Sequence, residues 1–163
     1  LEARKMPVEI LHAFLEARCE HAELVFVGGG SSSDSGINAA ITIASESNPR
    51  VTWIQGATDI EVIELIANAD VFLALGTEGY GIPVLEAIAA GTPVVYGGIQ
   101  PAAELMQGGG ARAHMGLEHV NLVELFHTYA QPGQVEELRS EIDISRIPSW
   151  ADFAMSIARS CKS

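Results

Sequence analysis

Short apolar runs alternate with longer segments of helical periodicity along the first two thirds of the chain. Each run is almost continuously apolar, as in residues 71–75, which is typical of a strand buried on both faces of a parallel sheet. The intervening segments are long enough for the helical crossovers that parallel strands require. The sequence therefore predicts an α/β fold, a doubly wound, Rossmann-like parallel sheet with helices on both faces. The expected strands are residues 23–27, 51–54, 70–75 and 92–96.

Caps and helix breakers mark the ends of the expected helices. Pro7 suits a first helical turn, where its missing N–H is not needed. Thr58 and Glu61 have the spacing of a capping box, and Gly91 fits the end of a helix. After about residue 111 the pattern turns mostly helical, and residues 31–36 are expected to form a flexible loop. The expected helices are residues 7–20, 37–47, 58–69, 83–90, 118–130, 135–142 and 150–161.

The start of the chain departs from this pattern. A doubly wound domain opens with a strand, but residues 1–5 lead almost directly into a helix. We expect the first strand to lie upstream of Leu1, or another element to fill its place. No internal repeat or low-complexity linker divides the chain, so residues 1–163 are expected to form a single domain.

The charge balance restricts the ligands that the chain can bind. The formal net charge is −12, from 9 basic and 21 acidic residues. Such a surface repels phosphate backbones, so we expect no nucleic-acid partner. The apolar runs are far shorter than the roughly 20 residues needed to cross a bilayer. No signal peptide opens the sequence, and the two cysteines lack the spacing of metal ligands, so the domain is expected to be cytoplasmic.

Residues 76–87 carry the clearest functional signal, because there an expected strand ends and a helix begins. In open α/β sheets, ligands bind outside the carboxyl ends of the strands. Gly79 and Gly81 permit a close approach of the backbone to a ligand. The helix behind them presents free N–H groups and the positive end of its dipole. These features predict a diphosphate site that needs no basic patch.

Two glutamates, Glu78 and Glu86, bracket this turn. If all the residues between them were helical, they would lie about 12 Å apart along the axis, roughly the reach from sugar to ribose in a nucleoside diphosphate sugar. Each carboxylate could then accept hydrogen bonds from paired hydroxyl groups. Alternatively, Glu78 is a loop residue and Glu86 a solvated helix position. Against this alternative, a carboxylate within so apolar a helix is costly unless it is partnered. The residues alone leave both interpretations open.

Residues 78–95 resemble the E-x7-E signature of the group 1 retaining glycosyltransferases, whose GT-B fold consists of two facing Rossmann-like domains. Further segments resemble this family in order and spacing, across almost the whole chain. The resemblance implies that the chain is the C-terminal, nucleotide-sugar-binding half of such an enzyme. The further segments are residues 4–14, 24–28, 51–56, 70–71, 103–105 and 149–154.

The resemblance also implies roles for individual residues. Glu86 would bind the ribose hydroxyls of the donor, and Glu78 would be the catalytic residue that contacts the donor sugar and helps to stabilise the charged transition state. Lys5 matches the diphosphate-binding lysine of the family. The family's companion arginine is absent, and Arg4 does not stand in its place. The backbone amides expected to hold the distal phosphate and the sugar are those around Gly79, Tyr80, Gly81 and Ile82.

The expected function is transfer of a sugar from a nucleotide sugar to an acceptor, with retention of the anomeric configuration. The sequence lacks a D-x-D pair, so we expect no metal and no cofactor. The acceptor, a saccharide, a lipid or another small molecule, would bind in a facing N-terminal domain, and the complete protein could associate peripherally with membranes. The chain alone is expected to be inactive.

Two alternatives stay open at this point. One is a nucleotide-sugar epimerase of the same fold, against which the run from Glu78 to Glu86 argues. The other is a catalytically silent module for nucleotide-sugar binding or assembly, which the absent first strand and the absent arginine favour. The donor sugar, the base, the acceptor and the oligomeric state do not follow from the sequence.

Overall fold

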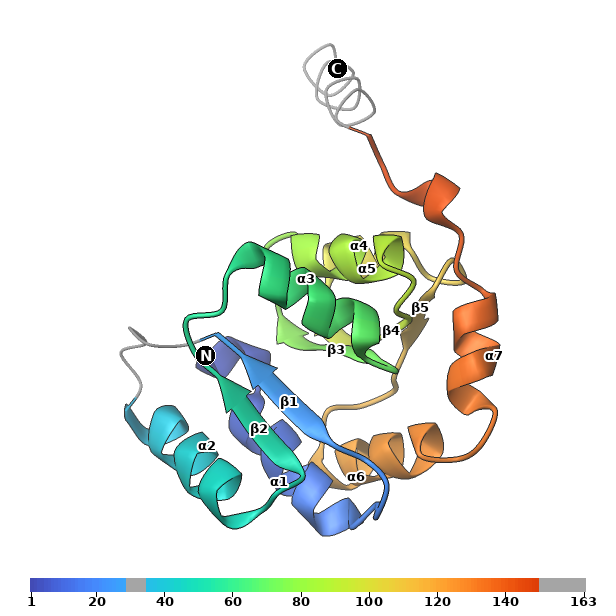
Figure 1. Ribbon diagram of the computed structural model, residues 1–163. Helices are drawn as coiled ribbons and strands as arrows, with labels where there is room; N and C mark the ends of the chain where they lie inside the picture. The colour runs from blue at the N-terminus through green and yellow to red at the C-terminus, as the bar shows by residue number, and fades with distance from the viewer. Residues whose placement is uncertain (29–34, 150–163) are drawn as a thin grey trace.

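The computed structural model describes residues 1–28 and 35–149, and its described strands pair in parallel within two sheets (Figure 1). One sheet has the order β1-β2 and the other the order β3-β4-β5. The α/β class with parallel strands is thus confirmed, although the strands do not form one continuous sheet. The strands are β1 (Leu24–Val27), β2 (Val51–Ile54), β3 (Phe72–Thr77), β4 (Val94–Ile99) and β5 (Ala111–Ala113).

The expected helices are present wherever the structure describes the chain. Thr58 forms the expected capping box, because its hydroxyl accepts a hydrogen bond from Glu61 N and its own N–H donates to Glu61 Oε2. Ser35 and Gly36, expected in a loop, instead begin a helix, and the expected helix 150–161 lies outside the described residues. The helices are α1 (Pro7–Ala17), α2 (Ser35–Ser47), α3 (Asp59–Asn68), α4 (Ile82–Ala89), α5 (Pro101–Leu105), α6 (His119–Tyr129) and α7 (Gln134–Ser140), with 3-10 turns η1 (Ala3–Lys5) and η2 (Ile144–Arg146).

Strands β3 and β4 begin and end later than the sequence predicts. Both continue through glycines that follow the apolar runs, and Gly76 lies opposite Gly98 in the parallel register. A Cβ atom on Gly98 would lie 2.2 Å from the carbonyl oxygen of Gly76, so the strands approach each other there as only glycine allows. The later ends of both strands carry the polypeptide further toward the edge of the sheet at which a ligand would bind.

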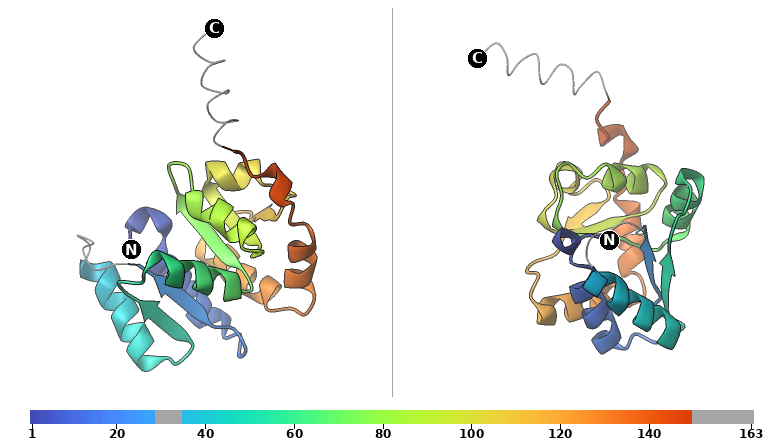
Figure 2. Two further views of the ribbon diagram at one scale, coloured as in Figure 1. Left: turned by 45° about the horizontal axis from the view of Figure 1, so that its top comes forward. Right: turned by 90° about the vertical axis from the view of Figure 1, so that its left-hand side faces the viewer.

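Successive side chains of β3 and β4 enter two different apolar clusters. Leu75 and Val95 pack in a cluster with α1 and α6, whereas Ala74 and Val94 pack in another with α4 and α5. Figure 1 shows these pairs of helices on opposite sides of the β3-β4-β5 sheet, and Figure 2 shows the same layers from two other directions. The prediction of helices on both faces is therefore confirmed.

The break between the two sheets follows the topology of a doubly wound fold. The strand order of that fold is 3-2-1-4-5-6, and β2-β1 followed by β3-β4-β5 matches it if position 1 is left without a strand. Leu1 packs against the cluster that contains residues of β1, and η1 contacts β3, so the first residues lie beside both sheets. Val25 on β1 is apolar but 44% exposed. Among residues 1–28 and 35–149, no strand occupies this position.

Candidate functional site

The residues of the predicted site gather at the carboxyl ends of β3 and β4. The loop that follows β3 is held in place by two backbone hydrogen bonds, from Glu78 N to Ile99 O and from Ala102 N to Tyr80 O. Gly81 has a left-handed conformation, with φ of 94°, and immediately precedes α4. In the described part of the chain, no side chain caps this helix start. The N–H groups of its first turn are therefore available to an anionic ligand.

Glu78 is the most strongly bound of the predicted site residues. Its Oε1 accepts hydrogen bonds from Arg4 Nη1 at 2.8 Å and from Gly79 N at 2.9 Å, and its Oε2 lies 3.0 Å from Lys5 Nζ. Burial raises the pKa of Glu78, but the hydrogen bond from Gly79 and the contacts with Lys5 and Arg4 outweigh it and lower the pKa to about 2. The carboxylate is therefore ionised at neutral pH, so it accepts hydrogen bonds and does not act as a proton donor.

Arg4 is a site residue that the sequence did not predict. Its guanidinium bridges the carboxylate of Glu78, the carbonyl oxygen of Thr77 at 2.7 Å and the carboxylate of Glu2 at 2.6 Å. Arg4 and Glu78 are more than 70 positions apart in the sequence, so no local sequence pattern predicts their contact. The one available signal was the pair of adjacent cations, Arg4 and Lys5, in a strongly acidic chain.

Glu86 is placed differently from Glu78. It lies on the exposed face of α4, while Val84, Ala87 and Ile88 of the same helix are buried. The cost expected for an unpartnered carboxylate in so apolar a helix therefore does not arise, because the helix turns Glu86 away from its apolar neighbours in sequence. Among the described residues, no side-chain hydrogen bond or ion pair engages it. Because α4 begins only at Ile82, the distance of about 12 Å for an entirely helical spacing does not describe this pair.

A cavity of about 100 Å³ lies beside these residues. Lys5, Glu78 and Gly81 line it together with Gln100, which the sequence did not single out. Tyr80 is 41% exposed and, like Ile82 and Glu86, is not part of its lining. The remaining lining residues belong to β3 and to the first turn of α4, namely Phe72, Leu73, Ala74, Leu75, Pro83 and Val84.

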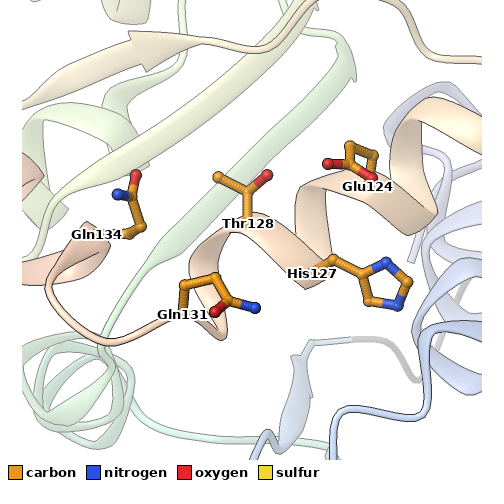
Figure 3. A pocket seen from close by; sticks show the side chains of 5 residues that line it. All are labelled: Glu124, His127, Thr128, Gln131 and Gln134. Carbon is orange, nitrogen blue, oxygen red and sulfur yellow. The ribbon is translucent and has the colours of Figure 1, made fainter.

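A larger and more open hollow lies on α6 and at the start of α7, and it contains none of the predicted site residues. Figure 3 shows its lining side chains, which are Glu124, His127, Thr128, Gln131 and Gln134. The His127 ring is already hydrogen-bonded to the carbonyl oxygen of Ala17, at 3.0 Å. We place the functional site at the smaller cavity, because that cavity combines an ionised carboxylate, two nearby cations and a helix start.

Residues 1–28 and 35–149 hold no group of three or more His, Cys, Asp or Glu side chains that could bind a metal ion. Metal-independent ligand binding therefore stays a prediction. In the same part of the chain, every helix is too short or too polar to cross a membrane.

The sequence matches a family model described as "Glycosyl transferases group 1" over residues 3–126. The chain belongs to this glycosyltransferase family. The match includes η1, the loop that carries Glu78, and α4, so the cavity described above lies within the family domain. None of the curated proteins matches the sequence significantly.

Solved structures confirm the fold of the glycosyltransferase domain. The trehalose-6-phosphate phosphatase N-terminal domain of Candida albicans matches with a TM-score of 0.74 and 13% identity, over 98% of this chain and 39% of that one. HepE of Anabaena, in complex with UDP and glucose, matches with a TM-score of 0.67 and 20% identity, over 99% and 46%. Sucrose-phosphate synthase of Thermosynechococcus elongatus matches with a TM-score of 0.65 and 18% identity, over 99% of this chain and 42% of that one. This chain thus spans less than half of each of these proteins.

Proposed function

We propose that this chain is the donor-binding domain of a retaining glycosyltransferase, which transfers a sugar from a nucleoside diphosphate sugar to an acceptor. The observation that carries the proposal is the environment of Glu78, an ionised carboxylate held by Lys5, Arg4 and the N–H of Gly79 beside an uncapped helix start. Cations, free amides and a fixed negative charge in one place are what a reacting sugar diphosphate requires.

The diphosphate would bind to the first-turn amides of α4 and to Lys5. Lys5 has three donors on its ammonium group, so it can bind a phosphate oxygen without leaving Glu78. Local donors of this kind suffice even though the chain carries a net charge of −12. Glu86 has no competing partner among the described residues and is exposed, so its carboxylate can accept hydrogen bonds from the ribose hydroxyls.

Glu78 would act on the sugar as a fixed negative charge. As the bond to the leaving diphosphate breaks, positive charge develops on the sugar ring, and a nearby carboxylate stabilises it. At the same time Lys5 and the helix amides stabilise the charge that develops on the diphosphate. Arg4 would position Glu78 for this step, because its guanidinium binds both the carboxylate and the backbone at Thr77.

The complete enzyme would place a facing N-terminal acceptor domain over this site, and a strand upstream of Leu1 would lie between β1 and β3. The coverage of less than half of HepE supports this division, and HepE has also been solved in complex with UDP-glucose. We propose further that the enzyme is cytoplasmic and needs no metal or cofactor. Its acceptor would be a saccharide, a lipid or another small molecule.

The test is calorimetric titration of the complete protein with UDP, GDP and ADP and with their hexose conjugates, each with and without EDTA. We expect one base to bind both as the diphosphate and as the sugar conjugate, with affinities that chelation leaves unchanged. Product analysis by NMR should then show transfer with retained configuration. Absence of binding in the whole panel would overturn the proposal, and loss of binding with EDTA would overturn its metal-independent part. Epimerised nucleotide sugar in place of transfer would favour the epimerase.

A further inference from the structure

Gln100 is one of two buried polar residues in the described chain, and the side chains of the two differ in their hydrogen bonds. The hydroxyl group of Thr92 donates a hydrogen bond to the carbonyl oxygen of Ile66, at 2.6 Å. Gln100 is only 2% exposed, yet the hydrogen bonds of the described residues include none to its side-chain amide. No described side-chain N or O atom is both fully buried and unpaired, so the amide atoms of Gln100 keep some accessibility, and Gln100 lines the cavity beside Glu78.

The backbone around Gln100 brings this residue close to Glu78. Gln100 lies between the end of β4 and the start of α5, and its carbonyl oxygen accepts a hydrogen bond from Glu104 N. The preceding residue, Ile99, binds the backbone of Glu78. The Gln100 Oε1 atom lies 3.8 Å from the position that a Cβ atom would take on Gly81, and Glu78 Cγ lies 3.6 Å from the same position. The amide and the carboxylate are thus neighbours at the start of α4.

The carboxamide of Gln100 differs from the charged side chains around it in the hydrogen bonds that it can form. A buried amide without a hydrogen-bond partner costs free energy, so such a group is retained where a ligand or ordered water completes it. The charged ammonium group of Lys5 can only donate hydrogen bonds, and the charged carboxylate of Glu78 can only accept them. Gln100 can both donate and accept, so it suits a neutral hydroxyl group better than it suits a phosphate.

We propose that Gln100 is a specificity-determining residue, whose side-chain amide hydrogen-bonds a hydroxyl group of the sugar to be transferred. This inference rests on the proposed function. A hydroxyl group that donates to the carboxylate of Glu78 leaves its oxygen free to accept a hydrogen bond from the amide of Gln100. The cavity of about 100 Å³ has room for roughly three water-sized groups, enough for one hydroxyl-bearing edge of a hexose. The donor sugar is therefore one that carries a hydroxyl group at this edge, and its deoxy analogue is rejected.

The test compares the nucleoside diphosphate with its sugar conjugate in the complete protein. Gln100→Met keeps the length of the side chain and removes the amide. We expect it to weaken binding of the hexose conjugate about tenfold while changing the affinity for the bare diphosphate less than twofold. Gln131→Met is the matched control, because Gln131 is exposed and lines only the other hollow, and it should change neither affinity.

A second measurement works on the wild-type protein and does not depend on any variant folding. Hexose conjugates that lack single hydroxyl groups are titrated in turn, and we expect one of them to lose about tenfold in affinity. Gln100→Met should reduce the difference in affinity between that analogue and the parent donor, because only the hydrogen bond to Glu78 then distinguishes them. Equal weakening of diphosphate and conjugate by Gln100→Met, or no weakening of either, would overturn the inference and leave the proposed function intact. Failure of the wild-type protein to bind any nucleotide would overturn both.

Discussion

The carbonyl oxygen of Arg4 lies against Gly76 so closely that a Cβ atom on Gly76 would be 2.1 Å from it. This contact sets η1 on the end of β3, and from there the side chains of Arg4 and Lys5 reach Glu78. Gly76 has φ of 87°, a conformation that residues with a side chain rarely adopt. The position of both cations in the site therefore depends on the absence of a side chain at Gly76.

Gly76→Ala is expected to destabilise the chain by at least about 1–3 kcal/mol, from backbone strain alone, and to weaken nucleoside diphosphate binding because η1 must move away. Thermal unfolding and calorimetry of the variant measure the two effects. Gly28→Ala separates strain from the clash, since Gly28 has φ of 100° but no atom lies within 4 Å of the position that its Cβ atom would take. It should reduce stability and leave affinity unchanged. Equal affinity losses in the two variants would contradict the role of Gly76.

The pH dependence of Glu78 follows from its low pKa. The pKa in the folded chain is about 2, below the ordinary 4.5, so the ionised carboxylate stabilises the fold above pH 4.5, and this contribution is lost as the pH falls through about 2. Arg4→Met should raise the pKa of Glu78, because it removes one of the cations that favour the ionised form. A carbon-13 NMR titration of the carboxyl group measures the shift.

The control for this titration is Arg139→Met, which removes an exposed cation that pairs only loosely with Asp70, at 3.8 Å. It should leave the titration of Glu78 as in the wild-type chain. If Arg4→Met behaved in the same way as this control, the contact between Arg4 and Glu78 would have no electrostatic effect.

The two glutamates should separate by ligand. Glu86→Ala is expected to weaken binding of the diphosphate and of the sugar conjugate alike, by about 1–3 kcal/mol, because a charged hydrogen-bond acceptor is lost. Glu78→Ala should not weaken binding of the diphosphate, because Lys5 no longer binds a carboxylate and stays available to the phosphate oxygens. It should, however, abolish most of the sugar transfer. Calorimetry and turnover of the complete protein decide between these outcomes. Loss of diphosphate affinity in both variants to the same extent would refute the assignment of the two residues to opposite ends of the donor.

The chain of residues 1–163 by itself should show no sugar transfer. A site with one open side neither excludes water nor orients an acceptor, and both are needed for the reaction. Donor and acceptor supplied together to the purified chain should give no product above the rate of donor hydrolysis, whereas the complete protein should give transfer. Turnover by the chain alone would show that the second domain is not required.

Local patterns in the sequence were sufficient for most of the fold. The capping box at Thr58 and the periodicity of Pro7–Ala17 depend on neighbouring residues only, and both are confirmed. Strand β5 and helix α5 were missed because they are three and five residues long, too short for a periodic signal. The ends of β3 and β4 lie beyond the apolar runs that predict these strands, because Gly76 and Gly98 pair inside the sheet.

The candidate site was predictable only in part. The turn around Glu78 and Gly81 follows from its place between a strand and a helix, and the structure confirms that place. The contacts of Arg4 and the burial of Gln100 depend on residues far apart in the chain, and no local pattern encodes them. The exposure of Glu86 could not be decided from the sequence, because apolar neighbours in sequence do not fix the face of a helix on which a residue lies.

The division of the sheet has a consequence for handling the protein. β1 pairs on one side with β2, and β3 pairs on one side with β4, so within the described residues each has a second edge that no strand covers. Open strand edges are templates for the strands of other molecules, and β1 also carries the exposed, apolar Val25. A preparation of residues 1–163 alone is therefore prone to edge-to-edge aggregation, which low protein concentration or a fused covering strand would suppress.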